Sequence, residues 1–363
     1  MNIRLAGTPK PAHPATVSVA RARWSVLAAG LAIAVSFVII ATVRLPFIVW
    51  SPGAVTDLYA VSDGQAALTV TGVPVYPTSG KLQVAGVQAS GQGISLFKGL
   101  GAFYDPGQAV VPVSVNGSVG APIAQVALGA DSAEAQRAAA AAALQLAGLP
   151  VERAPRVVSV MATGPSFALL MPDDVIEAVG STTVTSVADF NQAIGQHSVG
   201  DTIQLTVTRD DKRLDNQIDV VAGGSNTEQQ TPSLGITMAD SYLLGGVSVQ
   251  SAATEIGSGL MLALAIYDIV TPDTMLGTMS VAGAGVIDAN GTVTAVAGAN
   301  ERLLAAQAAG AQVYLLPSGN CGNVFLDGLS MKVVAVNSLS QAVDALEALS
   351  KGQTNWQVPT CQS

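Results

Sequence analysis

The 363-residue sequence has few charged, aromatic, cysteine and histidine residues, and only one long apolar run. Charged residues make up 11% of the chain and aromatic residues 4%, and the formal net charge is −9. A phosphate backbone requires clustered Lys and Arg, and no basic stripe with interleaved aromatic residues follows the first segment. We therefore expect no nucleic-acid partner. No Gly-Lys-Ser/Thr phosphate-binding loop occurs either, so we expect no ATP site.

The two cysteines and two histidines are too few and too widely separated to form a zinc cluster. Cys321 and Cys361 belong to no Cys-x-x-Cys motif, and His13 and His197 lie far from both in sequence. We expect no metal site and no cofactor. The even number of cysteines, together with the export argued below, predicts a Cys321–Cys361 disulfide; two separate buried thiols are the alternative.

The long apolar run covers residues 24–43 and reads WSVLAAGLAIAVSFVIIATV. Its 20 uncharged residues are enough to cross a hydrocarbon core, and it is longer than the apolar core of a cleavable signal peptide. The residues before it include four basic and no acidic side chains. The positive-inside rule then predicts a basic cytoplasmic tail at residues 1–23, an uncleaved transmembrane signal anchor at 24–43, and an extracellular remainder.

The exported part divides by composition. Short Val-rich runs separated by Pro and Gly predict a β-rich segment at residues 45–130. An Asp or Ser cap followed by an Ala-rich stretch predicts a helix at residues 131–146, which ends before Gly148 and Pro150. The polar residues 223–233 predict a linker. We expect one unit at 131–222, including the helix, a second at 234–349, and a C-terminal tail at 350–363.

The first unit has a recognisable order of segments. Strand RVVSVMA precedes a Gly-Pro-Ser turn, the stretch LLMPDDVI, a helical patch VADFNQAIGQ and strand DTIQLTVTRDD. This order resembles bacterial PDZ domains, with Asp173 where the family usually has Gly in its Leu-x-Pro-Gly-Asp-x-Ile turn. The resemblance implies that a peptide adds as a strand. It also implies that the peptide carboxylate binds the N–H groups of a loop, for which the candidates are Leu146, Ala147, Gly148 and Leu149. A small packing module without a ligand is the alternative.

Three stretches follow one another in residues 234–349: GLMLALAIYDIVTP, then VAGAGVIDANGTVTAVAG with a tight Asn290-Gly291 turn, then ERLLAAQAAGAQVYLLPSGNC. Their order and spacing resemble the proteolytic domain of Lon, in particular the membrane-anchored PDZ–Lon-like proteins of bacteria. The resemblance implies a serine endopeptidase domain of α+β type, which would act without ATP because the ATPase module is absent. Because Lon domains assemble as rings, it also implies a homo-oligomer.

The Lon family uses a serine nucleophile and a lysine base, whose pKa burial lowers. Aligned on the Gly-Leu-Met that begins at Gly259, the serine position is occupied by Gly257, and the family's Gly-Gly-x-x-x-Lys pattern puts Arg302 at the lysine position. Glycine has no nucleophile and arginine stays protonated, so we predict a pseudoprotease. Ser258, one residue later, is the fallback nucleophile, or else a helix-capping hydroxyl.

The sequence therefore predicts an α/β (α+β) protein with one transmembrane helix, a PDZ-like domain and a Lon-like domain outside the cell. Its expected function is to bind peptides, unfolded proteins or partner proteins without cleaving them. Two alternatives remain: an active ATP-independent serine endopeptidase that uses Ser258, and a structural envelope protein.

Overall fold

The computed structural model describes residues 24, 27–35, 44–62, 64–90, 93–105, 107–112, 132–209, 212–223, 231–252, 257–353 and 360–361. The predicted tail at 1–23 and part of the predicted anchor at 24–43 lie outside these residues. Residues 27–35 are helical. Among the helices that the described residues form, none has the length and apolar character that a membrane crossing requires.

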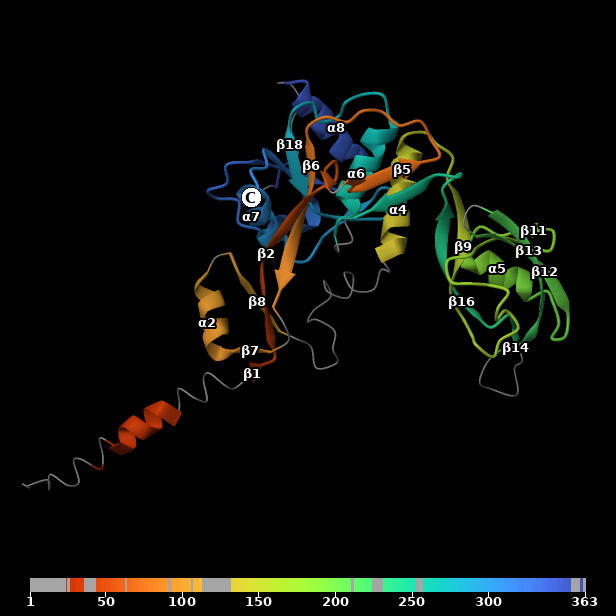
Figure 1. Cartoon of the computed structure of the whole chain (residues 1–363), viewed down its shortest axis with the longest axis horizontal. Helices are drawn as coiled ribbons and strands as arrows, with labels where there is room; N and C mark the ends of the chain where they lie inside the picture. The colour runs from red at the N-terminus through yellow and green to blue at the C-terminus, as the bar shows by residue number, and fades with distance from the viewer. Residues whose placement is uncertain are drawn as a thin grey trace, which may run out of the picture.

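The larger of two mixed bodies, called here the large domain, is built on a sheet whose strands come from distant parts of the chain (Figure 1). Its strand β6 lies between β2 and β18, with Leu82 opposite Val281 in a parallel pair. The predicted β-rich segment and the predicted Lon-like unit therefore share one sheet. In spatial order its six strands are β22 (Lys332–Val336), β21 (Val313–Pro317), β18 (Ser280–Gly283), β6 (Lys81–Ala89), β2 (Phe47–Asp57) and β8 (Ala109–Pro112).

Helix α6 (Gly259–Val270) forms the centre of the large-domain core, because most of its side chains are buried. Helix α4 (Ser132–Leu146) packs against it, and the small Ala side chains of α4 allow a close approach. We expected α4 to belong to the PDZ-like unit, but its apolar face lies in the large-domain core. Helix α8 (Leu339–Ser350) joins the same core, whereas α7 (Ala299–Ala308) contacts β2 and β6 and adds to a second cluster.

Short elements complete the large domain. The expected Asn290-Gly291 turn is present: Gly291 has φ +82°, and the Asp288 carboxylate accepts hydrogen bonds from the N–H groups of Asn290 and Thr292. The paired short strands are β1 (Arg44–Leu45) with β7 (Ile94–Ser95), β3 (Val61–Ser62) with β4 (Gln65–Ala66), β5 (Leu68–Thr71) with β17 (Ser248–Ser251), and β19 (Val286–Ile287) with β20 (Val293–Thr294).

The second body, called here the small domain, has its own sheet and core. Helix α5 (Val187–Ile194) contributes Phe190 to this core, together with Ile176 and Leu205 from the sheet. Its strands lie in the order β13 (Lys212–Asp219), β12 (Thr202–Arg209), β10 (Val175–Val179), β9 (Glu152–Val160) and β16 (Ile236–Leu243), with β11 (Thr182–Thr183) paired to β10.

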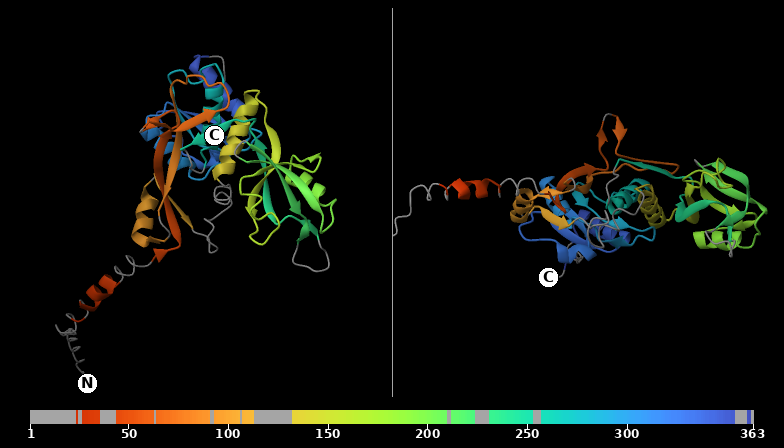
Figure 2. Two further views of the ribbon diagram at one scale, coloured as in Figure 1. Left: turned by 45° about the vertical axis from the view of Figure 1, so that its right-hand side comes forward. Right: turned by 90° about the horizontal axis from the view of Figure 1, so that it is seen from below.

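Strand β16 follows the predicted linker, and we expected it in the Lon-like unit. The structure instead pairs it with β9, so the small domain extends beyond residue 222. Both ends of the linker are paired as well, because β14 (Val221–Gly223) and β15 (Thr231–Ser233) form a two-stranded ribbon. Since Glu152 lies opposite Leu243, the chain enters and leaves the small domain at the same place. The small domain is therefore an insertion in the large domain, and both views of Figure 2 show it beyond α4.

A disulfide joins Cys321 to Cys361, with the Cα atoms 5.4 Å apart, as the export interpretation expected. Cys321 lies in the 3-10 helix η1 (Ser318–Asn323), so the bond attaches the end of the chain to the large domain. The bond closes a loop with a sequence separation of 40, which stabilises a fold by about 3–4 kcal/mol in the chain-entropy account.

One carboxyl group is buried in the large-domain core. Asp268 of α6 accepts a hydrogen bond from the Tyr59 hydroxyl at 2.7 Å and another from the Met275 N–H at 3.0 Å. Burial raises the pKa of Asp268 above its ordinary value of 3.8, and the two hydrogen bonds oppose that rise. Burial also raises the pKa of Tyr59, with a contribution from the Asp268 charge, so this phenol stays protonated.

We expect Asp268 to make the protein less stable as the pH rises above 3.8. The folded state binds this proton more tightly than the unfolded state, so its stabilising contribution is complete below 3.8 and is lost as the pH rises through the raised pKa. Asp268→Asn should flatten the dependence of the unfolding free energy on pH, measured by urea denaturation across a pH series. The control is Asp273→Asn, at an exposed carboxylate. Equal slopes in wild type and Asp268→Asn would contradict the prediction.

Candidate functional site

Strand β16 forms one edge of the small-domain sheet. It pairs with β9 from Ile236 opposite Val160 to Leu243 opposite Glu152. Within the part of the chain that the structure describes, no strand pairs with its other side. Helix α5 lies against both β16 and β9. The unpaired backbone edge of β16 is therefore flanked by a helix.

The turn that leads into β16 is fixed by close contacts. Gly235 has φ +70°, and a Cβ atom there would lie 3.1 Å from the Gly164 Cα and 3.3 Å from the Pro165 Cδ. The Ser166 hydroxyl donates to the Leu234 carbonyl at 2.7 Å, and the Met161 N–H donates to the Gly235 carbonyl at 2.8 Å. A left-handed residue in such a turn can direct successive N–H groups to one side, as in anion-binding nests.

The far end of the same edge is joined to α5. The Asp240 carboxylate accepts a hydrogen bond from the Val187 N–H at 2.6 Å, and Val187 is the first residue of the helix. The Ser186 hydroxyl caps the same helix by accepting from the Asp189 N–H at 3.1 Å. The Asp240 bond therefore links the N-terminus of α5 to β16.

The residues from Leu146 to Leu149, expected to receive a peptide carboxylate, form the C-terminal end of α4. The N–H groups of Ala147, Gly148 and Leu149 donate to the carbonyls of Ala143, Gln145 and Leu144, respectively. Gly148 has φ +75°, as helix C-terminal glycines commonly do. These three donors already bind the helix end, and Leu149 packs on the large-domain core. The expected carboxylate-binding role therefore does not fit this geometry.

The Leu234-Gly235-Ile236 turn is not among the predicted sites, because it follows the polar linker and was expected in the next unit. One signal was available in the sequence. A glycine between two apolar residues precedes the alternating stretch ITMADSYL, as expected for a turn into a half-buried strand.

The predicted serine and lysine positions lie beside each other. A Cβ atom on Gly257 would be 3.6 Å from both the Cζ and the Nη2 of Arg302, although 45 positions separate the two residues along the chain. Gly257 has φ +85°, a backbone conformation that an L-serine rarely adopts. The added Cβ would also approach Val296 to 3.0 Å. The structure thus brings the two positions together in a conformation that favours glycine.

Arg302 is buried and binds backbone carbonyls. Its Nη1 donates to the Ala85 carbonyl of β6 at 2.6 Å, and its Nε donates to the Ala297 carbonyl at 3.0 Å. These bonds connect α7 to the N-terminal half of the large sheet. A guanidinium accepts no proton, so this geometry offers no general base.

Two further titratable groups accompany Arg302. Burial raises the pKa of Glu301, and the neighbouring Arg302 charge acts in the opposite direction. Burial also raises the pKa of Tyr314. The Arg302 charge opposes only part of this rise, so the phenol stays neutral. Among the described residues, the buried Tyr314 hydroxyl has no hydrogen-bond partner. Both side chains are buried, so neither offers an accessible base.

Ser258 occupies the residue before α6 and is buried. Its side chain makes no capping hydrogen bond to the helix, so the capping interpretation is wrong. Its φ of −79° and ψ of −11° are already helical.

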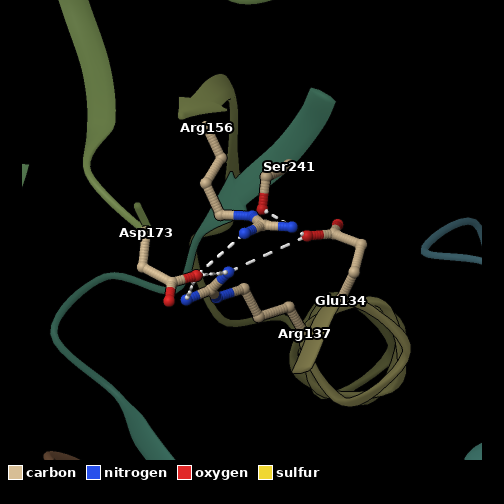
Figure 3. Close-up of polar contacts among 5 residues, drawn as sticks. All are labelled: Glu134, Arg137, Arg156, Asp173 and Ser241. Atoms are coloured by element: carbon tan, nitrogen blue, oxygen red, sulfur yellow. Dashed lines mark hydrogen bonds and ion pairs between the residues drawn. The ribbon is translucent and has the colours of Figure 1, made fainter. Parts of the chain in front are cut away.

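A cluster of charged side chains joins α4 of the large domain to the small domain (Figure 3). Arg156 of β9 is almost fully buried; it donates from Nε to Glu134 at 3.1 Å and from Nη1 to Asp173 at 2.8 Å. Arg137 of α4 donates two 3.1 Å hydrogen bonds to the same Asp173 oxygen. The Ser241 hydroxyl of β16 donates to Glu134 at 3.2 Å. Two cations and two anions thus balance across the domain boundary.

Asp173 stands where the PDZ family usually has glycine, and its φ of +75° explains that preference. Left-handed backbone costs roughly 1–2 kcal/mol for a residue with a Cβ, least for Asp and Asn. Hydrogen bonds from Arg156 and Arg137 to the Asp173 carboxylate offset this cost. The residue that departs from the family pattern is therefore one of those that connect the two domains.

A cleft of about 710 Å³ lies beside this cluster, between α4 and the small-domain sheet. Arg137 and Asp173 line it together with Glu152, Glu177 and the chain segment that leads from β16 to β17. That segment contains Gly245 and Gly246, both in left-handed conformations. The cleft therefore lies between the two domains, next to the chain segment that leads from β16 to β17.

Comparisons with known proteins agree with part of this picture. Residues 128–220 match the PDZ domain family. The PDZ domain of the SdrC-like protein from Listeria monocytogenes is 27% identical over 23% of this chain and 86% of that one, with a TM-score of 0.22. The corresponding domain from Listeria innocua is 25% identical over 23% and 92%, with a TM-score of 0.22. No curated protein matches. The chain therefore contains a PDZ domain; the matched range overlaps the small domain, but it includes α4 and ends before β16.

Proposed function

We propose that the protein binds an extended peptide segment along β16 and does not cleave it. The observation that carries this proposal is the edge of β16, which is unpaired among the described strands and is flanked by α5. A peptide that adds beside β16 would become the new edge strand of the sheet. It would pair its backbone with β16 and place alternate side chains against α5. Protein or peptide binding is also what a PDZ domain suggests.

The peptide would run antiparallel to β16, with its C-terminus at the Gly235 turn. Leu234, Gly235 and Ile236 replace Leu146–Leu149 as the proposed carboxylate-binding residues, since the latter use their N–H groups in the helix end. The Gly235 N–H donates to the Ser233 hydroxyl at 3.2 Å, and a carboxylate is a stronger acceptor than a hydroxyl. The Asp240–Val187 hydrogen bond at the other end limits the contact to a few peptide residues.

The large domain is proposed to be a Lon-like scaffold without protease activity. The contact between Gly257 and Arg302 supports this, because the family's two catalytic positions meet here without a nucleophile or a base. The bonds from Arg302 to the backbone give the arginine a structural role instead. We further propose that residues 24–43 anchor the chain in the cell membrane with the domains outside, and that the large domain forms a homo-oligomer.

We expect peptides selected for binding to depend on a free C-terminal carboxylate. Ser233→Glu places a negative charge beside the Gly235 turn and should weaken binding of such a peptide about tenfold, since two like charges about 5 Å apart repel by about 1.4 kcal/mol at an effective dielectric near 50. The measurement is fluorescence polarisation with a labelled peptide taken from a library with free C-termini.

The matched control is Gln217→Glu, which adds the same charge to the exposed face of β13, at the opposite edge of the sheet. It should leave the Kd unchanged, and amidation of the peptide should reproduce the loss. Equal affinity for the free and amidated peptides in wild type and Ser233→Glu would argue against this binding site.

The wild-type protein should not degrade unfolded casein, and Ser258→Ala should behave identically. The double variant Gly257→Ser/Arg302→Lys restores both functional groups, yet we expect little turnover, because φ +85° strains serine and because small misplacements can cost about a hundredfold. The measurement is release of fluorescent peptides from labelled casein. Turnover by the wild type that disappears in Ser258→Ala would favour the second candidate, an active endopeptidase.

A further inference from the structure

Helix α2 (Leu96–Tyr104) carries an unusual concentration of exposed apolar side chains. Leu96, Leu100, Phe103 and Tyr104 are 43%, 54%, 77% and 78% exposed. The helix contains no acidic residue, and its only charge is Lys98, which is also exposed. A helix on a water-facing surface normally turns its large apolar side chains inward.

The inward side of α2 is made of small residues instead. Ala102 is its one fully buried residue, and Gly99 faces Ile94, whose Cδ1 would lie 3.2 Å from a Cβ added there. Ala102 and Ile94 form a minor core with Val49. The helix is therefore attached to the protein by its small residues, while its large apolar residues point away from that core.

The position of α2 in the fold suggests what covers these side chains. The apolar run of residues 24–43 leads directly into β1, where Arg44 is paired with Ser95. Ser95 is also the N-cap residue of α2. Paired strands place such residues about 5 Å apart, and a nine-residue helix is about 14 Å long. All of α2 thus lies close to the end of the apolar run, and Figure 1 shows α2 beside β7 and β1 at the end of the molecule from which the N-terminal helical residues extend.

We propose that α2 is a membrane-surface helix, which inserts Leu96, Leu100, Phe103 and Tyr104 among the lipids next to the anchor. This inference rests on the proposed membrane anchor. An aromatic pair such as Phe103 and Tyr104, whose rings are 5.7 Å apart, suits the headgroup boundary, where one side of a ring is apolar and the other wet. Lys98 and the exposed Arg44 would contact anionic headgroups.

A second copy of the chain is the competing occupant of this surface. The pairing of β1 with β7 favours lipid, because it keeps α2 next to the anchor whatever the oligomeric state. The helix also shows one exposed cation and no acidic partner for another copy's Lys98, whereas an anionic bilayer supplies many.

The test uses the full-length chain in vesicles of equimolar phosphatidylethanolamine and phosphatidylglycerol. A nitroxide is attached to Phe103→Cys or, in a second variant, Leu100→Cys, while the native cysteines stay in their disulfide. Collision with oxygen, which concentrates in lipid, is compared with collision with a water-soluble nickel chelate. The matched control is Phe325→Cys, since Phe325 of the large domain is 75% exposed and Phe103 is 77%.

We expect oxygen accessibility to exceed nickel accessibility severalfold at positions 103 and 100, and the reverse at position 325. Nickel accessibility at 103 equal to that at 325 would overturn the role of α2 while leaving the anchor intact, provided that the chain still floats with the vesicles. A label shielded from both reagents, with dipolar broadening, would assign the surface to a second copy and also overturn the proposal. A chain that stays in the supernatant would overturn both the anchor and this inference.

Discussion

A fragment that contains only residues 234–363 will not fold. In the intact chain β6 fills the position between β18 and β2, and its residues Leu82 and Val84 are buried in the large-domain core. Without β6, β18 becomes an exposed edge and α6 loses part of its cover, while Arg302 loses the Ala85 carbonyl. Domains are stable by only about 5–15 kcal/mol, so the loss of several large buried side chains exceeds what the fragment can tolerate.

The measurement is circular dichroism and two-dimensional amide spectra of the purified fragment, compared with residues 44–363. The control removes a different internal stretch of the chain and should fold. Because Glu152 lies opposite Leu243, residues 152–243 can be replaced by a short Gly-Ser linker without separating any strands of the large sheet. A cooperative thermal transition in the 234–363 fragment would show that the N-terminal strands are not needed for the core.

Arg209→Met should destabilise the PDZ domain by about 3–5 kcal/mol, because it leaves a buried carboxylate without its cation. Asp174 is fully buried and accepts hydrogen bonds from Arg209 Nε at 2.6 Å and Nη2 at 2.7 Å. Of the hydrogen bonds described for the Asp174 side chain, only the one from the Met171 N–H, at 2.8 Å, would remain. Arg209 also donates to the Leu169 carbonyl, so the loop before β10 loses a second contact.

The effect should be confined to the small domain, so hydrogen exchange followed by mass spectrometry is the suitable measurement. Amides of β10 and β12 should exchange 100-fold faster or more, whereas amides of α6 should keep their protection. Arg213→Met is the matched control, because Arg213 is mostly exposed and pairs with Glu177 only at 3.5 Å; it should cost less than about 1 kcal/mol. Equal protection in Arg209→Met and Arg213→Met would mean that Asp174 needs no cation.

Local features of the fold were accessible from the sequence. Cap and stop signals located α4 to within a residue, the helical patch VADFNQAIGQ covers α5, and the Asn290-Gly291 pair predicted a turn that the structure contains. These features depend on neighbouring residues alone, so a single sequence contains the information. The alignment that placed Gly257 and Arg302 at equivalent family positions also predicted two residues that prove to be neighbours.

Long-range partners were not accessible in the same way. The Ala-rich face of α4 indicates that it packs against something, but nothing in its periodicity distinguishes α6 from the PDZ domain. Apolar and polar residues alternate in β16 as expected for a strand. Its partner β9, however, lies on the other side of a polar linker that was interpreted as a domain boundary. The left-handed Asp173 could be identified only as a departure from a family pattern, because its compensating partner Arg137 lies 36 residues away on another domain.

The insertion of the small domain in the large one also orders the events of synthesis. All strands of the small-domain sheet lie between residues 152 and 243, so this domain can fold once that continuous stretch has been made. By contrast, β6 has no neighbour β18 until about 200 further residues have been made, because Leu82 pairs with Val281. While the ribosome makes those residues, the apolar strands β2 and β6 are exposed to wrong partners. Partly made chains are therefore expected to expose the first strands of the large sheet for longer than the strands of the PDZ domain.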